Sequence, residues 1–340
     1  MGAMIDKAQA AIDKVNDLGD LKDKIFTEFN PERILNAAGQ AEEHAASHPD
    51  LPLDGMLVSI KDLYDEEGVA TTAASKLLKD RAPANDDCDV VRLVKDAGAI
   101  PFGRTTLSEF AYSGVGLNPH YGTPGNIFDP EGIPGGSIRI PSAINGLYGF
   151  KPSRLSVPGT GIHPLANSFD TPGPLAGDLE TAISVFEVMS GQSVRAETGD
   201  DHVLRIGVPV SGFVEGLDAR VKDDFAMVCA QLQAAGHELV EIDLGFISDN
   251  AILSKILVSF EAHKIYSGDF DKLETCGDPR VLSRMKFADT LSKDEVIAAY
   301  TKRTDLVSRF GSAMADVDVM IAPTLPIMAP KIVEVEADFD

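Results

Sequence analysis

Cysteine, long apolar stretches and positive charge are all scarce in this chain. Its three cysteines, Cys88, Cys229 and Cys276, are odd in number and far apart among 340 residues. This argues against a disulfide framework and favours a reducing compartment, so we predict a cytoplasmic protein. A helix that spans a membrane needs at least about 18 apolar residues in a row, and no such run occurs, so no membrane span is predicted. A basic segment followed by an apolar block, the mark of a secretory signal, is also missing from the start of the chain.

Positive charge is outweighed by negative charge. Lysine and arginine total 30 against 53 aspartate and glutamate residues, which gives a formal net charge of -23. Such a surface repels phosphate backbones, so this acidic protein is not expected to bind nucleic acid. The charge instead favours solubility.

Several common catalytic motifs are absent as well. No phosphate-binding P-loop and no glycine-rich dinucleotide fingerprint occur, and the seven histidines show no zinc-ligand spacing. The nucleophile elbow of α/β-hydrolases is also missing. The sequence therefore implies no metal ion and no organic cofactor.

The regular part of the chain alternates strands with helices, which is typical of an α/β protein. Residues 5–48 are predicted to be helical and exposed. The predicted strands cover 56–60, 99–103, 205–210, 238–242 and 317–322, and the predicted helices lie around 90–94, at 179–189 with Asp178 as N-cap, at 218–235 and over most of 251–315.

Between residues 114 and 174 glycine and proline crowd together and periodicity is lost, which inside a compact domain indicates a functional loop region. Two features can carry chemistry. One is Lys61, at the end of the predicted strand 56–60, and the other is the turn Gly135-Gly136-Ser137 inside this loop region. A serine needs a base to become nucleophilic, and a buried lysine with a lowered pKa can be that base. The two glycines allow backbone N–H groups to point at one oxyanion. Taken alone, each feature is more often structural, as a solvated strand end and an ordinary turn.

A series of segments that occur in a fixed order favours the catalytic interpretation of Lys61 and the Gly-Gly-Ser turn over the structural one. They are 53–55 (Leu-Asp-Gly), 58–62 (Val-Ser-Ile-Lys-Asp), 103–111 (Gly-Arg-Thr-Thr-Leu-Ser-Glu-Phe-Ala), 118–124, 133–142, 146–153 and 168–176. Together they make residues 51 to about 180 resemble the amidase signature family. Residues 200–330 fit more loosely and end in the similar Ile-Ala-Pro-Thr at 321–324.

The resemblance implies a fold and a domain division. The expected fold is one large α/β domain at 51–340, with a central mixed β-sheet flanked by helices, preceded by a helical segment at 4–50. Family members continue well past the position of Asp340, so the C-terminal part is expected to be incomplete.

The resemblance also implies an activity. Family members are Ser-Ser-Lys hydrolases that cleave the C–N bond of linear carboxylic amides other than peptide bonds. Lys61 corresponds to the catalytic base, Ser137 to the nucleophile that forms an acyl-enzyme, and Gly135 and Gly136 to the oxyanion loop. The expected partner is a small-molecule amide substrate, and the resemblance suggests a homodimer.

The chain departs from the family at this turn. Members carry two Gly-Gly-Ser units, of which the first supplies a serine that passes the proton between lysine and nucleophile. Here one unit remains, with Ile133-Pro134 typical of the first unit on its left and 138–141 typical of the second on its right. The longer flank assigns Ser137 to the nucleophile. The bridging serine then has no counterpart, which puts activity in doubt.

Other candidates and interpretations stay open. Tyr112 and Ser113 are possible pocket residues, although a core tyrosine is the commoner case. Arg139 holds the loop or contacts substrate, His163 is expected to be a loop histidine, and Asp170 is expected to cap a turn rather than to act in catalysis. The alternative functions are that of a glutamine-dependent amidotransferase component, the amidase-like chain of a larger complex, and that of an inactive amidase-like remnant or binding protein.

Overall fold

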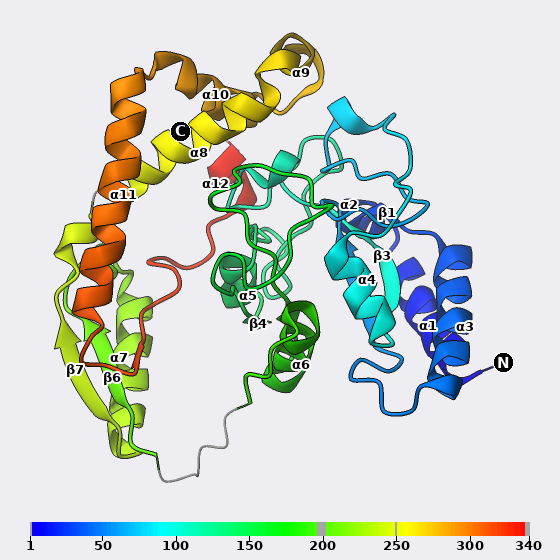
Figure 1. Ribbon diagram of the computed structural model, residues 1–340, viewed down its shortest axis with the longest axis horizontal. Coiled ribbons are helices and arrows are strands. Elements are labelled where there is room, and N and C mark those ends of the chain that lie inside the picture. The colour runs from blue at the N-terminus through cyan, green and yellow to red at the C-terminus, as the bar shows by residue number, and fades with distance from the viewer. Residues whose placement is uncertain (1, 196–201, 249, 337–340) are drawn as a thin grey trace. The chain divides into compact units, whose positions relative to one another are not determined.

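The computed structural model describes residues 2–195, 202–248 and 250–336, and these form two compact units (Figure 1). The first unit comprises the described residues up to 194 together with 268–282 and 331–336. The second comprises the described residues among 195–267 and 283–330. Each unit is described by itself.

The N-terminal helices of the first unit contribute to its core. In chain order the elements are α1 (Ala3–Asn16), α2 (Leu21–Ile25), β1 (Phe26–Glu28) and α3 (Pro31–Ser47). Helix α3 starts where its sequence predicts, because Pro31 occupies the first turn and the Asn30 side chain caps the N–H of Arg33. Helices α1 and α3 lie side by side and bury Ile12 and Ile34 in a cluster with Phe102 (Figure 1). The expectation that this segment is simply exposed is therefore wrong for its inner face.

A small mixed sheet is built around β3 (Ile100–Thr105). Its order is β1-β3-β2, with β2 (Leu57–Lys61) parallel and β1 antiparallel to β3. Helix α4 (Asp89–Asp96) connects the parallel pair and buries Val90, Val91 and Val94. These side chains form one cluster with Ile60 and with Phe186 of α6 (Leu179–Ser190). The carboxyl end of β2, where Lys61 lies, is thus anchored by a packed βαβ unit.

The region predicted to be rich in loops, 114–174, contains two short elements, helix α5 (Arg139–Ile144) and strand β4 (Tyr148–Gly149), which pairs antiparallel with β5 (Leu175–Ala176) just after the region. The 3-10 helices η1 (Lys76–Leu78) and η2 (Glu109–Ala111) precede it. Helix α6 follows, and the Asp178 side chain accepts the N–H of Thr181 as the predicted N-cap. Helices α9 (Phe270–Cys276) and α12 (Ile332–Glu336) complete the first unit.

The second unit holds a parallel sheet of order β7-β6-β8 and a set of helices. Its elements are β6 (Arg205–Pro209), α7 (Ala219–Ala234), β7 (Glu238–Ile242), η3 (Gly245–Ile247), α8 (Asn250–Tyr266), η5 (Phe287–Thr290), α11 (Lys293–Ala313) and β8 (Val319–Met320). The elements η4 (Ser267–Asp269) and α10 (Pro279–Lys286) lie where the chain passes from one unit to the other. Helices α8 and α11 pack together, and α11 begins with a capping box between Ser292 and Glu295.

The predicted α/β class is confirmed, and the strands of the described residues form sheets of three, two and three strands. The predicted helices and strands are found close to their expected positions, although β8 is shorter than the predicted strand at 317–322. None of the described helices combines the length and the apolar character that crossing a membrane requires.

Candidate active site

Lys61 is the last residue of β2 and pairs in register with Thr105 of β3. Its side chain is half-buried, and no hydrogen bond to its ammonium group is formed by the described part of the chain. Burial lowers the pKa of Lys61 from 10.5 to about 8, and the negative charge of Asp170 partly opposes this shift. A lysine with this pKa is partly neutral in mildly alkaline solution and can accept a proton.

Asp170 lies beside this lysine although it is far away in the sequence. One of its carboxylate oxygens, Oδ2, accepts the N–H groups of Leu165 at 2.9 Å and Ala166 at 3.0 Å, so the predicted turn-capping role is confirmed. The sequence did not reveal its electrostatic effect on Lys61, since no spacing rule connects the two residues. Only the folding of the loop brings the carboxylate to the strand end.

The loop that contains His163 runs along the residues that follow Lys61. The N–H of His163 donates to the carbonyl of Leu63 at 2.7 Å, and Asp65 donates to Gly161 at 2.9 Å. Burial, with the nearby Arg81 charge, lowers the pKa of His163 to about 4, and burial raises the pKa of the Tyr64 phenol above its ordinary value. Both groups are therefore uncharged at neutral pH.

The residue after Lys61 fixes a turn with unusual backbone geometry. Asp62 is almost fully buried, and its Oδ1 accepts the Thr72 N–H at 3.0 Å and the Arg104 Nη2 at 3.2 Å. Its Oδ2 accepts the Thr72 hydroxyl. The next two residues along that turn, Ala73 and Ala74, have φ of 50° and 47°, which is the left-handed region. Such non-glycine residues persist only where surrounding contacts hold them, and they occur often at functional sites.

A second buried carboxylate holds the same turn from another direction. Glu109 accepts the Ser75 hydroxyl at 2.6 Å and contacts His120 Nε2 at 2.9 Å through Oε1, and it accepts the Asp278 N–H at 2.7 Å through Oε2. Its neighbour Phe110 is also left-handed, with φ of 54°. Glu109 lies in one of the segments that resemble the family, but its hub role is set by long-range contacts.

Ser137 lies two residues before α5, in a left-handed conformation with φ of 67°, and it is exposed. The N–H groups of the two preceding glycines do not point into open space. Gly135 donates to the Val115 carbonyl at 3.2 Å and Gly136 donates to the Gly114 carbonyl at 2.7 Å. In this arrangement neither predicted oxyanion donor is free, because each already serves a backbone carbonyl.

The predicted pocket residues are distributed around this turn. The carbonyl oxygen of Ser113 lies against Gly136, where an added Cβ would come within 2.2 Å of it, so this position has room only for glycine. Tyr112 is half-buried just after η2. Arg139 is exposed at the start of α5, and its charge is the smaller of two causes, after burial, that lower the pKa of Lys151. The pocket roles of Tyr112, Ser113 and Arg139 stay predictions.

The segment 170–173 connects the two halves of the predicted site. Its first residue, Asp170, acts on Lys61, and Gly173 packs against Ile138, whose Cδ1 would lie 3.0 Å from an added Cβ. Three residues of chain span at most about 10 Å, so both halves lie near one short segment. Among the described residues, however, no hydrogen bond joins Lys61 to Ser137. Nor do the described residues include a group of three or more histidine, cysteine, aspartate or glutamate side chains that could hold a metal ion.

The family model for amidases matches the chain over residues 3–137 and 134–339, and the chain belongs to this family, the amidase signature enzymes. The two matched stretches overlap at Pro134–Ser137. The one Pro-Gly-Gly-Ser segment therefore serves both as the end of the first stretch and as the start of the second, in agreement with the interpretation that two units have become one.

Curated relatives include a glutamyl-tRNA(Gln) amidotransferase subunit from Lachnoclostridium phytofermentans, 29% identical over 371 positions that cover 90% of this chain and 75% of the relative. The alignment is longer than the chain of 340 residues, so the relative has residues that this chain lacks. A 2-amino-5-chloromuconic acid deaminase of Comamonas testosteroni is 28% identical, covering 89% of this chain and 72% of the relative.

Solved structures agree on the fold. A crystal structure of an amidase is 26% identical, with a TM-score of 0.86, and the match covers 97% of this chain and 80% of that one. A glutamyl-tRNA(Gln) amidotransferase subunit from Thermotoga maritima matches with a TM-score of 0.70 at 21% identity, over 83% of this chain and 70% of that one.

Proposed function

We propose that this protein hydrolyses a small linear carboxylic amide, with Ser137 as nucleophile and Lys61 as base. The observation that carries the proposal is the half-buried lysine at the end of β2, whose pKa is about 8, in a chain of the amidase family. Burial without an ion pair within hydrogen-bond range is costly for an ordinary structural lysine, whereas a general base benefits from a pKa near the working pH.

The reaction divides into two steps. The neutral Lys61 amine removes the proton of the Ser137 hydroxyl, and the serine oxygen attacks the amide carbonyl. The tetrahedral intermediate then collapses, the C–N bond breaks, and the lysine returns the proton to the leaving amine or ammonia. Water next attacks the acyl-enzyme while Lys61 accepts its proton, the ester bond to Ser137 breaks to release the acid, and Lys61 returns the proton to the serine oxygen. Because no hydrogen bond joins the two residues in the structure, we include a water molecule as the proton carrier.

A fluorophosphonate probe tests the nucleophile. We expect one probe per chain on Ser137, located by peptide mass spectrometry, and no labelling of Ser137→Ala. Hydrolysis of a panel of simple amides should be lost in both Ser137→Ala and Lys61→Met. Full activity of the Lys61→Met protein would refute the mechanism.

A role as the subunit of a glutamine-dependent amidotransferase is a second candidate, favoured by the names of several relatives. In that case glutamine would be the preferred amide and a second protein would accept the ammonia. Ammonia release from glutamine, compared with release from simple aliphatic amides, separates the two candidates.

An inactive remnant that binds a ligand or partner is the third candidate, favoured by the engaged N–H groups of Gly135 and Gly136. A folded protein whose Ser137 never reacts with the probe would support it.

A homodimer and a cytoplasmic location remain parts of the proposal that gel filtration and fractionation can test.

A further inference from the structure

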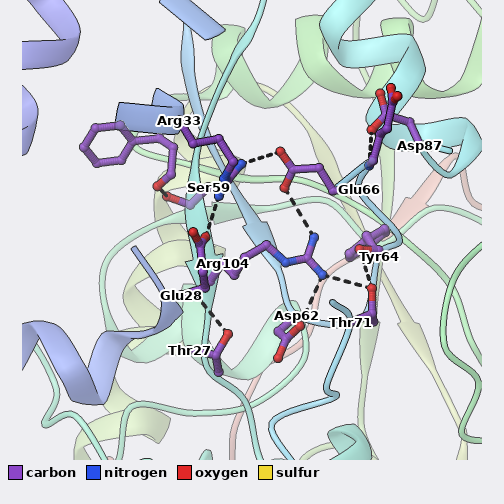
Figure 2. A network of polar contacts seen from close by, with 12 residues as sticks. Thr27, Glu28, Arg33, Ser59, Asp62, Tyr64, Glu66, Thr71, Asp87 and Arg104 are labelled. Carbon is purple, nitrogen blue, oxygen red and sulfur yellow. Dashed lines mark hydrogen bonds and ion pairs between the residues drawn. The ribbon is translucent and has the colours of Figure 1, made fainter. Parts of the chain in front are cut away.

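A ladder of alternating charges runs through the first unit from Glu28 to Asp62, the residue that follows Lys61 in the chain (Figure 2). Its inner end is the Asp62–Arg104 pair, in which Arg104 is fully buried and donates to Asp62 at 3.2 Å. The other Arg104 terminal nitrogen lies 3.6 Å from Glu66. Glu66 in turn accepts a hydrogen bond of 2.6 Å from Arg33, which also contacts Glu28 at 2.5 Å.

The inner pair holds three pieces of chain at the strand end. Arg104 also donates to the Thr71 hydroxyl at 3.3 Å, and that hydroxyl donates to the Tyr64 carbonyl at 3.2 Å. Asp62 takes both the N–H and the hydroxyl of Thr72, and its own N–H donates to the Thr105 carbonyl at 3.1 Å. The peptide that follows Lys61 is therefore fixed to β3 on one side and to the turn at 71–74 on the other.

A gain in folding stability does not explain the buried Asp62–Arg104 pair well. A buried ion pair often contributes little net stability, because the cost of removing two charges from water offsets their attraction. Arg104 also keeps Nε and Nη1 without a hydrogen bond, and Asp62 holds Ala73 and Ala74 in left-handed conformations, which are unfavourable for residues other than glycine. What the pair does provide is one defined position for the backbone on which Lys61 is mounted.

We propose that Asp62 and Arg104 are positioning residues, which hold the turn at 71–74 against the end of β2 and thereby keep the Lys61 amine in place and shielded from water. The inference rests on the proposed role of Lys61 as base. Neither residue is proposed to touch the substrate. The charged group that acts on Lys61 is Asp170, and those that face Arg104 are Asp62 and Glu66.

The test compares two variants that each remove one positive and one negative charge. The near variant is Asp62→Asn with Arg104→Met, and the control is Glu28→Gln with Arg33→Met, at the outer end of the same ladder. Three quantities are measured: the melting temperature, the pKa of Lys61 from NMR of ¹³C-methylated lysines, and kcat and KM for amide hydrolysis. The NMR resonance of Lys61 is assigned by its absence in Lys61→Arg.

For the near variant we expect the Lys61 pKa to rise by about one unit toward 10.5, because water reaches the loosened strand end. We also expect kcat to fall about tenfold to a hundredfold at unchanged KM, as a base displaced by about 1 Å would cause. The control is expected to lower the melting temperature while the pKa of Lys61 and kcat stay at their wild-type values.

A near variant whose Lys61 pKa and kcat stay at their wild-type values, as in the control, would overturn the proposal and leave the pair a purely structural feature. If the near variant does not fold, Thr72→Ala, which keeps both charges, decides by the same pKa shift or its absence. A wild-type protein without turnover would contradict the proposed function, yet the NMR titration would still show whether Asp62 and Arg104 position the lysine.

Discussion

The two halves of the candidate site differ in how firmly the structure holds them. Around Lys61, buried side chains of Asp62, Arg104 and Glu109 tie down a turn with left-handed residues. Around Ser137, the serine is exposed and the neighbouring glycine N–H groups serve backbone carbonyls. The comparison teaches that the part of the chain around the proposed base is held by buried polar contacts, whereas the proposed nucleophile lies in an exposed turn with a single Gly-Gly-Ser unit.

The largest effect is expected from restoring the missing stretch. Replacing Pro134–Ser137 by the segment of an active relative that runs from its first through its second Gly-Gly-Ser unit should raise kcat/KM at least about a hundredfold, because a proton carrier is returned between base and nucleophile. The measurement is amide hydrolysis by the wild-type and repaired proteins. A glycine-serine linker of equal length serves as control, and an equal gain with that linker would contradict the explanation.

The second effect separates activity from stability at Lys61. Lys61→Met should reduce hydrolysis about 10²- to 10⁴-fold, yet raise the free energy of unfolding near pH 7 by about 1–3 kcal/mol. The pKa of Lys61 is lowered from 10.5 to about 8 in the folded protein, so the unfolded chain binds more protons between these values. The wild-type protein therefore gains stability from this group as pH rises from 8 to 10.5, and the advantage of the variant disappears over that window.

Urea unfolding at several pH values measures this difference, with exposed Lys222→Met as the matched control. If both variants showed the same pH dependence, Lys61 would not be the perturbed lysine.

The third prediction tests whether the turn that carries the exposed Ser137 is closely packed at the neighbouring Gly136. Gly136→Ala places a Cβ within 2.2 Å of the Ser113 carbonyl and should lower the free energy of unfolding by about 1–3 kcal/mol. Gly159→Ala, where no atom lies within 4 Å of the new Cβ, is the control. Equal melting temperatures for the two variants would show that the segment at 113–116 does not hold the turn.

The smallest effect concerns His163, in the loop that runs along the residues after Lys61. The pKa of His163 is lowered from 6.5 to about 4, so the unfolded chain binds more protons between these values and stability falls as pH drops through that window. His163→Gln should remove about 1–2 kcal/mol of this acid destabilisation. Thermal unfolding at pH 7 and near pH 4.5 measures it, and exposed His202→Gln should behave as wild type.

Much of the local structure follows from local signals. Pro31 after Asn30 starts α3, Asp178 caps α6, and apolar runs give β2, β3, β6 and β7 close to their predicted bounds. These features depend on residues a few positions apart in the sequence, so they can be predicted from the sequence alone. The lysine, the serine and the single Gly-Gly-Ser were visible in the same way, as part of a series of motifs.

The contacts that decide what these residues can do were not visible. These contacts join segments that are distant in the sequence. The charge of Asp170 acts on Lys61, and Asp62 binds both Arg104 and the turn at 71–74. The N–H groups of Gly135 and Gly136 donate to the carbonyls of residues 114–115. Each depends on burial, which sets both the pKa of a charged group and the need of a polar group for a partner. The amino-acid order was sufficient to identify the family and the likeness of each motif. Only the folded chain, by removing water from some of these groups and leaving others exposed, distinguished the half-buried Lys61 from the exposed Ser137.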